Sequence, residues 1–417
     1  MEMWHIRGGN RLSGVCEVQG SKNAALPIIA ASILAPRLSF LQNVPMLSDV
    51  NAALQILRHL GCSAEQQGNE LRIDSTGLSR FRIPRELMEQ MRSSVIFMGA
   101  LIARCGEAKL SLPGGCPLGE RPIDLHLMAL RKLGARIVEE DGEIHCIGKD
   151  LKGTRIRLPF PSVGATENTM LAACRAKGET VLYGAAREPE IVALQEYLRS
   201  MGAQIVGAGS DVIRIDGMRR CEAVRHRILP DRIVGATLAC AAAATGGELE
   251  LRNVEPSHFS TVLYFLNRAG CDIIKKEKSL RLTSPLRLRA VERVVTAPYP
   301  GFPTDAQPLL MAALLRSDGT TEIRETIFEK RFRQVPELCR LGADIRVDGG
   351  LALVRGVERL KGAALRATDL RGGAAMLLAG LTAEGETLVC DEGHISRGYE
   401  RFDERLRSLG AEIRLES

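Results

Sequence analysis

Residues 133–138 read LGARIV, and close variants of this stretch occur six times along the 417-residue chain. The other copies read LGCSAE, MGAQIV, AGCDII, LGADIR and LGAEIR, and they begin at positions 60, 201, 269, 341 and 409. Their glycines stand at 61, 134, 202, 270, 342 and 410, so successive copies are 73, 68, 68, 72 and 68 residues apart. Each glycine is placed where the end of a helix needs positive φ, and the alternating residues after it predict a strand. We therefore expect six related helix–turn–strand units.

A second pattern lies between these copies and consists of a helix of small apolar residues, a turn and a strand. The clearest example is TLACAAAATGGELELRN at 237–253, and MLAACRAKGETVLYG at 170–184 is similar. A complete unit of about seventy residues is longer than most solenoid repeats. We therefore expect an α/β fold whose units close around buried, alanine-rich helices. Six units divide into two domains of three, which we place at residues 21–229 and at 1–20 together with 230–417.

The composition predicts a globular protein with an aliphatic core. Hydrophobic residues make up 45% of the chain and charged residues 25%, whereas aromatic residues make up only 4%. The net charge is 56 − 50 = +6, which is mild for this length and suits a pocket for anions. A nucleic-acid surface would need a basic stripe and exposed aromatic residues for stacking. Nucleic acid is therefore not expected as a partner.

Neither export nor a membrane span is expected from the sequence. The first ten residues, MEMWHIRGGN, are not followed by the apolar stretch of a signal peptide. The longest apolar run, residues 23–36, is too short to cross a bilayer and contains Pro27. We therefore expect a cytoplasmic protein without a membrane partner.

The eleven cysteines include no CxxC pair, which is typical of a reducing compartment. The seven histidines show no metal-ligand spacing, so no metal site is expected. Five of the cysteines stand in apolar segments, and we expect them to be small buried core residues. These are Cys62, Cys174, Cys240, Cys271 and Cys339.

Cys116 differs from these cysteines because it stands in PGGCPLGERPIDLH, residues 113–126. The glycines and prolines exclude a long helix or a central strand, so this stretch is expected to be a loop that can change shape. A thiol on such a loop, five residues before Arg121, has surroundings that lower a thiol pKa and make it reactive. From the spacing alone, a surface turn with an incidental cysteine explains the stretch at least as well.

Polar residues precede each of the six small-residue helices at an equivalent place. Free backbone N–H groups and the helix dipole make such ends good sites for anions. N-capping accounts for the serines and aspartates but not for the cations, which oppose the dipole there. We therefore expect an anionic ligand at these helix ends. The residues are Lys22 with Asn23, Arg92, Ser162 with Gly164, Asp231, Asp305, and Asp369 with Arg371.

Eight segments, in order along the whole chain, resemble the UDP-N-acetylglucosamine 1-carboxyvinyltransferase family of enolpyruvyl transferases. One such segment is weak evidence, whereas eight in sequence are highly specific. They are SKNAALP at 21–27, PGGCPLGERPIDLH at 113–126, SVGATEN at 162–168, AAREPEI at 185–191, FPTD at 302–305, FEKRF at 328–332, TDLR at 368–371 and ISRGYER at 395–401.

The resemblance implies a fold and a reaction. The fold is a pair of inverse α/β barrels, each with three repeated units around buried helices, which agrees with the six repeats. The reaction transfers the enolpyruvyl group of phosphoenolpyruvate to the 3-hydroxyl of UDP-N-acetylglucosamine through a tetrahedral intermediate, and it releases phosphate. This is the first committed step of peptidoglycan synthesis. No metal, no organic cofactor and no obligate protein partner is implied.

The resemblance also implies a role for each matched residue. Cys116 is expected to protonate the methylene carbon of phosphoenolpyruvate, and Asp305 to take the proton of the attacking sugar hydroxyl. Lys22, Arg121 and Arg397 are expected around the phosphate and carboxylate of phosphoenolpyruvate, since cationic side chains suit such anions. Asn23 is matched to a contact with both substrates, and Asp369 and Arg371 to a pair near the reacting centre. The positions matched to the nucleotide sugar are Arg92, Arg121, Pro122, Ile123, Asp124, Leu125, Ser162, Val163, Gly164, Ile327 and Phe328.

Three positions depart from the family pattern. Phe160 stands where some relatives have lysine, Val234 stands where glutamate is usual, and Pro117 stiffens the residue after the thiol. None of the three is assigned to the chemistry. They leave open a divergent second copy with altered kinetics.

Two other functions are alternatives to this one. The sister family that acts on shikimate 3-phosphate is related in fold and chemistry, but the PGGC, TDLR and SRGYER segments favour the nucleotide-sugar enzyme. A catalytically silent paralogue that only binds the UDP-sugar is expected to lack Cys116, Lys22 or Asp305. All three residues are present.

Overall fold

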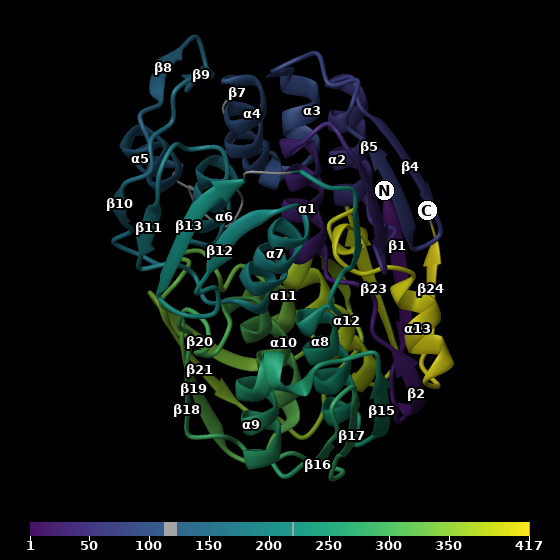
Figure 1. Cartoon of the computed structure of the whole chain (residues 1–417). Helices are drawn as coiled ribbons and strands as arrows, with labels where there is room; N and C mark the ends of the chain where they lie inside the picture. The colour runs from purple at the N-terminus through teal and green to yellow at the C-terminus, as the bar shows by residue number, and fades with distance from the viewer. Residues whose placement is uncertain (112–122, 219–220, 417) are drawn as a thin grey trace. The chain divides into compact units, whose positions relative to one another are not determined.

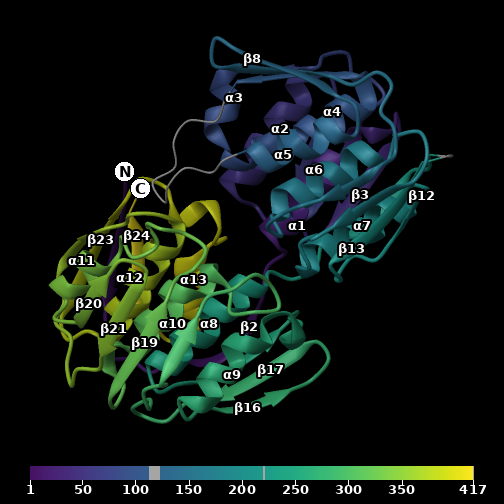
Figure 2. The same cartoon turned by 90° about the vertical axis from the view of Figure 1, so that its left-hand side faces the viewer.

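The computed structural model describes residues 1–111, 123–218 and 221–416 of the chain, and Figures 1 and 2 show it from two sides. The described residues form two compact units. The first unit consists of residues 20–111, 123–218 and 221–229, and the second of residues 1–19 and 230–416. The chain crosses from one unit to the other at Gln19–Gly20 and again at Leu229–Pro230.

The strands form six four-stranded sheets that follow one plan. In each sheet an edge strand pairs in parallel with a central strand, and the other two pairings are antiparallel. The first unit holds the sheet of β14 (Val224–Arg227), β3 (Leu38–Gln42), β5 (Glu70–Asp74) and β4 (Ser63–Gln67), the sheet of β6 (Arg82–Ile83), β7 (Glu107–Ser111), β9 (Glu143–Ile147) and β8 (Arg136–Glu140), and the sheet of β10 (Arg155–Arg157), β11 (Thr180–Tyr183), β13 (Val212–Met218) and β12 (Ala203–Val206).

The sheets of the second unit repeat this plan. They are the sheet of β2 (Ser13–Glu17), β15 (Glu248–Arg252), β17 (Ser279–Thr283) and β16 (Asp272–Lys275), the sheet of β18 (Arg293–Val295), β19 (Thr320–Arg324), β21 (Leu351–Arg355) and β20 (Asp344–Asp348), and the sheet of β22 (Ala364–Arg366), β23 (Glu386–Asp391), β1 (Glu2–Arg7) and β24 (Glu412–Glu416). Two strands from the beginning of the chain therefore complete sheets built from its second half. Figure 1 shows purple β1 beside yellow β23 and β24.

Three helices in each unit are buried along nearly their whole length. In the first unit they are α1 (Lys22–Ala31), α4 (Phe97–Cys105) and α6 (Val163–Ala173), and in the second α8 (Arg232–Ala244), α10 (Gln307–Ala313) and α12 (Leu370–Thr382). The helices α8, α10 and α12 pack against one another (Figure 2), and α4 packs against both α1 and α6. Alanine and glycine leave little side chain on these helices, which lets their backbones approach closely inside a core. The expectation of buried, alanine-rich helices is confirmed.

A second set of helices precedes the repeated glycines. It comprises α2 (Ser48–His59), α5 (Asp124–Lys132), α7 (Pro189–Ser200), α9 (Ser260–Arg268), α11 (Val335–Arg340) and α13 (Phe402–Ser408), while the short α3 (Arg85–Gln90) lies outside this set. All six glycines of the repeated motif have positive φ, between 92° at Gly342 and 108° at Gly270. Since L-residues with a side chain are strained at such angles, the glycines end these helices as expected. The α/β class and the six related units are thus confirmed.

The expectation for the cysteines holds for four of the five that the sequence singles out. Cys62, Cys174, Cys240 and Cys271 are buried, but Cys339 is exposed, so its assignment to the core is wrong. The reason is its place on α11. This helix turns Val335 and Leu338 into the core, and the next residue along the helix therefore points away from it.

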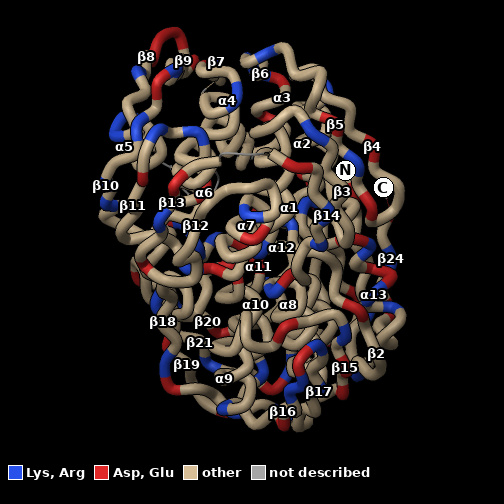
Figure 3. The backbone as a smooth tube through the Cα atoms, in the orientation of Figure 1, with Lys and Arg blue, Asp and Glu red and all other residues tan. Residues whose placement is uncertain are grey.

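Charged residues of both signs are interspersed along the strands and turns, as the view in Figure 3 shows around β8 and β9. Arg82 and Lys109, for example, both pair with Glu143, at 2.7 and 2.8 Å. Within the part of the chain that the structure describes, the longest apolar helices fall short of what a membrane crossing requires.

Candidate active site

Asp305 is held by two arginines in the second unit. It lies in a 3₁₀ turn, Thr304–Ala306, directly before α10. Its Oδ1 accepts a hydrogen bond from Nη2 of Arg331 at 3.0 Å, and its Oδ2 lies 3.6 Å from Nη2 of Arg371. About one third of the Asp305 side chain is exposed. The carboxylate is thus fixed from the protein side and reachable from outside.

Arg331 is the most deeply buried charged group of this cluster, with only 1% of its side chain exposed. Its Nε and Nη2 donate hydrogen bonds to the Thr304 carbonyl oxygen at 3.1 and 3.0 Å. Its Nη1 lies 3.7 Å from Oδ1 of Asp369. A guanidinium has a planar set of donors, and here these donors fix the turn that carries Asp305 as well as the carboxylate itself.

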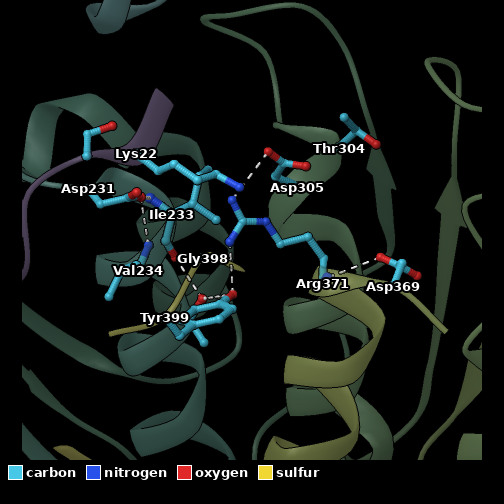
Figure 4. Close-up of polar contacts among 12 residues, drawn as sticks. Lys22, Asp231, Ile233, Val234, Thr304, Asp305, Asp369, Arg371, Gly398 and Tyr399 are labelled. Atoms are coloured by element: carbon cyan, nitrogen blue, oxygen red, sulfur yellow. Dashed lines mark hydrogen bonds and ion pairs between the residues drawn. The ribbon is translucent and has the colours of Figure 1, made fainter. Parts of the chain in front are cut away.

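Arg371 lies at the start of α12, and Figure 4 shows its guanidinium between Asp305 and Tyr399. Its Nη1 donates to the Tyr399 hydroxyl at 3.1 Å. Burial opposes the charge of Arg371, but Tyr399, Asp305 and Asp231 outweigh burial and raise the pKa of the guanidinium. The arginine therefore stays charged inside the protein.

Two aspartates at helix ends of the second unit, Asp231 and Asp369, are N-caps. Asp369 accepts hydrogen bonds from the backbone N–H groups of Arg371 and Gly372, both at 3.1 Å (Figure 4). Asp231 accepts from Ile233 and Val234 at 2.9 and 3.1 Å. Capping therefore accounts for these two residues, as it does for Ser162, whose side chain accepts from the Ala165 N–H.

Arg397 ends a 3₁₀ turn, Ile395–Arg397, that Asp391 organises. The two carboxylate oxygens of Asp391 accept from the N–H groups of His394 and Ile395, both at 2.9 Å. Further along the same loop, Gln19 donates to the Gly398 carbonyl and accepts from the Glu400 N–H. The backbone around Arg397 is thus fixed at several points within the second unit.

Lys22 and Asn23 are the first two residues of α1 in the first unit, and Ser21 caps this helix. The ammonium group of Lys22 lies 3.0 Å from Oδ2 of Asp49, and both side chains are largely buried. The cations at the helix ends predict an anionic ligand there. Lys22 has a carboxylate partner within the protein, as Arg371 has. These partners balance part of the positive charge at the helix ends without a ligand.

Two further segments that the sequence assigns to the nucleotide sugar approach each other within the first unit. Ile123, Asp124 and Leu125 form the start of α5, and Ser162, Val163 and Gly164 form the start of α6. They meet at His126, because a methyl group on Gly164 would lie only 2.8 Å from the imidazole Cε1. His126 Nδ1 accepts a hydrogen bond from the Asn168 amide at 2.8 Å, and burial lowers the pKa of the imidazole to about 4.

Several predicted site residues cannot be placed. Cys116, Pro117, Arg121 and Pro122 lie outside the described residues, and Arg92 is described only as the start of a 3₁₀ turn, Arg92–Ile96. Of the three departures from the family pattern, Phe160 is 44% exposed and Val234 is completely buried in α8. An apolar side chain suits the surroundings of Val234.

The structure adds partners that the sequence analysis did not single out. They are Asp49 for Lys22, Arg331 for Asp305, and Tyr399 for Arg371. Arg331 stands inside the FEKRF segment and Tyr399 inside the ISRGYER segment, so the motifs themselves could have pointed to these two residues. Asp49 is far from any quoted segment, and only the fold brings it to Lys22.

Comparison with known proteins identifies the class. A family model described as EPSP synthase (3-phosphoshikimate 1-carboxyvinyltransferase) matches residues 6–406. The enolpyruvyl transferase NikO from Streptomyces tendae has a similar structure, with a TM-score of 0.89 at 26% identity, over 99% of this chain and 98% of that one. EPSP synthase from Acinetobacter baumannii has the same fold, with a TM-score of 0.75 at 20% identity over all of both chains. The protein is therefore a carboxyvinyl transferase by fold and by family.

Sequence relatives narrow this class. UDP-N-acetylglucosamine 1-carboxyvinyltransferase 1 of Symbiobacterium thermophilum is 48% identical over 418 residues, which cover 99% of this chain and 95% of the relative. UDP-N-acetylglucosamine 1-carboxyvinyltransferase 2 of Caldanaerobacter subterraneus subsp. tengcongensis is 47% identical over 413 residues, 99% of each chain. The chain belongs to the UDP-N-acetylglucosamine 1-carboxyvinyltransferase family, and the resemblance seen in the eight segments is confirmed.

Proposed function

We propose that the protein transfers the enolpyruvyl group of phosphoenolpyruvate to the 3-hydroxyl of UDP-N-acetylglucosamine and releases phosphate. This is the first committed step of peptidoglycan synthesis, which we place in the cytoplasm. The observation that carries the proposal is the partly exposed carboxylate of Asp305, held by Arg331 and Arg371. The full-length identity of 46–48% to enzymes named for this reaction supports the choice of substrates.

The first half of the reaction is an addition. Cys116 gives a proton to the methylene carbon of phosphoenolpyruvate, which creates oxocarbenium character at the neighbouring carbon. The sugar 3-hydroxyl attacks that carbon while Asp305 takes its proton. Arg331 and Arg371 serve this step by keeping the Asp305 carboxylate in one orientation. The product is a tetrahedral intermediate that carries both the sugar and the phosphate.

The second half is an elimination. A proton leaves the new methyl group, the carbon–oxygen bond to phosphate breaks, and the enolpyruvyl ether remains on the sugar. Lys22, Arg121 and Arg397 bind the phosphate and carboxylate groups, and their positive charges stabilise the negative charge on the departing phosphate. Asp369 and Arg371 support the reacting centre. Neither a metal ion nor an organic cofactor takes part in this scheme.

A set of matched residues is proposed to hold the nucleotide sugar. We assign this role to the segment from Arg121 to Leu125, to Ser162, Val163 and Gly164, and to Arg92, Ile327 and Phe328, while Asn23 contacts both substrates. The close packing of α5 against α6 at His126 and Gly164 supports a common role for two of these segments. Free N–H groups at the start of α6 suit the diphosphate.

The test is a measurement of phosphate release from phosphoenolpyruvate by the purified protein. We expect release with UDP-N-acetylglucosamine and none with shikimate 3-phosphate or without an acceptor. Release with shikimate 3-phosphate alone would assign the protein to the sister reaction. Binding of UDP-N-acetylglucosamine without turnover would instead identify a silent paralogue.

A further inference from the structure

Glu325 is a buried carboxylate in the second unit that no step of the proposed reaction uses. It follows β19 directly and accepts four hydrogen bonds, all from neutral donors. Its Oε1 accepts from the Thr296 hydroxyl at 3.0 Å and from the N–H groups of Ile327 and Phe328 at 2.8 and 3.1 Å. Its Oε2 accepts from the Thr304 hydroxyl at 3.0 Å.

These bonds connect two segments that the proposed function places on the acceptor side of the reaction, one that binds the nucleotide sugar and one that carries the base for its hydroxyl. One is the turn after β19, with Ile327 and Phe328, and the other is the 3₁₀ turn with Thr304 and Asp305. Thr304 is bound at both ends, since its hydroxyl donates to Glu325 and its carbonyl accepts two hydrogen bonds from Arg331. Arg331 in turn holds Asp305. A continuous chain of polar contacts therefore runs from Glu325 to the carboxylate of Asp305.

The internal repeats supply a comparison within the same molecule. Glu325 is the sixth residue after Gly319, and the sixth residues after Gly178, Gly247 and Gly385 are Gly184, Asn253 and Asp391. Gly184 and Asn253 have positive φ and make no use of a carboxylate, so the repeated architecture itself does not require an acid here. An acid occurs at Glu325 and Asp391, and both acids bind N–H groups of loops that carry proposed substrate residues.

We propose that Glu325 is a positioning residue for the carboxyvinyl transfer, which fixes the Asp305 turn and the Ile327–Phe328 turn in the arrangement that binds UDP-N-acetylglucosamine. It acts through Thr304 on one side and through the two backbone N–H groups on the other. The inference rests on the proposed roles of Asp305, Ile327 and Phe328. Because all three belong to the acceptor side of the reaction, Glu325 governs the use of the nucleotide sugar more than that of phosphoenolpyruvate.

The experiment compares steady-state kinetics of Glu325→Ala and Glu325→Gln with the wild type, with both substrates varied in turn. Glu325→Ala leaves four donors without their acceptor, and we expect KM for UDP-N-acetylglucosamine to rise and kcat to fall by about tenfold or more each. We expect KM for phosphoenolpyruvate to stay within about twofold. Glu325→Gln keeps one acceptor oxygen and can donate to the Thr304 hydroxyl, so it should recover most of the lost activity.

A matched control is Thr321→Val on the same strand. The buried Thr321 hydroxyl accepts from the Val291 N–H at 3.1 Å, so this variant also loses a buried hydrogen bond, but away from the two turns. Thermal unfolding shows whether both proteins are folded to the same extent. A general loss of structure lowers kcat through the fraction of active protein and leaves both KM values unchanged.

A second variant tests the route through Thr304. Thr304→Val breaks the bond to Oε2, and the change from Glu325 to Ala should have a smaller effect on kcat in that background than in the wild type. Additive effects would overturn the route, and Glu325→Ala kinetics equal to those of Thr321→Val would overturn the positioning role. An inactive wild type would instead refute the proposed function, so the two failures are distinguishable.

Discussion

Nη2 of Arg331 lies 3.0 Å from Oδ1 of Asp305 although only 1% of the arginine side chain is exposed. A buried guanidinium is tolerated only when its donors are paired, and here the Thr304 carbonyl takes up the Nε–H and shares Nη2 with Asp305. The charge that the fold buries is thus placed beside the carboxylate that the proposed reaction needs.

Replacement of Arg331 by lysine should affect both stability and activity. A lysine has a single ammonium group and cannot reach Thr304 and Asp305 with separate donors. We expect a loss of about 1–3 kcal/mol in the free energy of unfolding and a fall in kcat of at least about tenfold. Chemical denaturation and phosphate release measure the two effects. Arg333→Lys, two residues further along the chain, where the side chain is exposed, is the control and should behave like the wild type.

Asp49 should matter for phosphoenolpyruvate because it holds Lys22. Asp49→Asn keeps the shape of the side chain but removes the charge 3.0 Å from the Lys22 ammonium group. A charge-assisted contact is worth about 1.5–3 kcal/mol, so we expect KM for phosphoenolpyruvate to rise about tenfold. Lys22→Ala should have a larger effect of the same kind. Calorimetric titration should find UDP-N-acetylglucosamine binding nearly unchanged, and an equal loss for both substrates would contradict this assignment.

His126 should make the protein less stable in mild acid. Burial lowers the pKa of its imidazole from 6.5 to about 4, so between these values the unfolded chain binds a proton that the folded chain does not. Stability should therefore be complete above about pH 6.5 and decrease as the pH falls toward 4, by roughly 3 kcal/mol in all. Denaturation of the wild type and of His126→Asn at pH 7 and pH 5 tests this. An equal pH effect in both proteins would exclude His126 as the cause.

Alkylation should distinguish Cys116 from the other cysteines. Burial raises the pKa of Cys62, Cys146 and Cys174 to about 12, which leaves almost no reactive thiolate at neutral pH. A phosphonate epoxide such as fosfomycin carries an anion for the proposed phosphate site and should modify Cys116, faster when UDP-N-acetylglucosamine is bound. Peptide mapping by mass spectrometry identifies the site.

Two substitutions check the role of this thiol. Cys116→Ser should abolish the modification, whereas Cys116→Asp should resist it and retain turnover, because a carboxylic acid can also deliver a proton. A label on Cys105, or full turnover by Cys116→Ala, would contradict the role of Cys116 as the acid.

The architecture was predictable because its signals are local and repeated. A glycine such as Gly134, at φ 98°, ends a helix wherever it occurs, and six such glycines at similar spacing define the units. Cys339 was misplaced because an apolar segment does not reveal which side of a short helix each residue occupies. In the structure Val335 and Leu338 occupy the buried face of α11, and Cys339 therefore lies on its exposed face.

The sequence singles out candidate site residues but not their contacts. Residue types and motifs point to Asp305, Arg371 and Lys22, and their roles stay predictions. Their partners come from distant positions, as Asp49 does for Lys22, and such pairs exist only once the chain has folded. Capping also explains Asp231 and Asp369 without any ligand, and the sequence alone could not separate capping from anion binding.

The pairing of β1 with β24 has a consequence for how the protein is made. Ile6 stands opposite Ile413, so β1 pairs with a strand that is synthesised 413 − 6 = 407 residues later. At about 5–20 residues per second this delay lasts roughly 20–80 s. All strands of the first unit lie between Leu38 and Arg227, so that unit is complete long before. Meanwhile β1 remains in the nascent chain without its partners β23 and β24, and an unpaired strand edge of this kind favours aggregation.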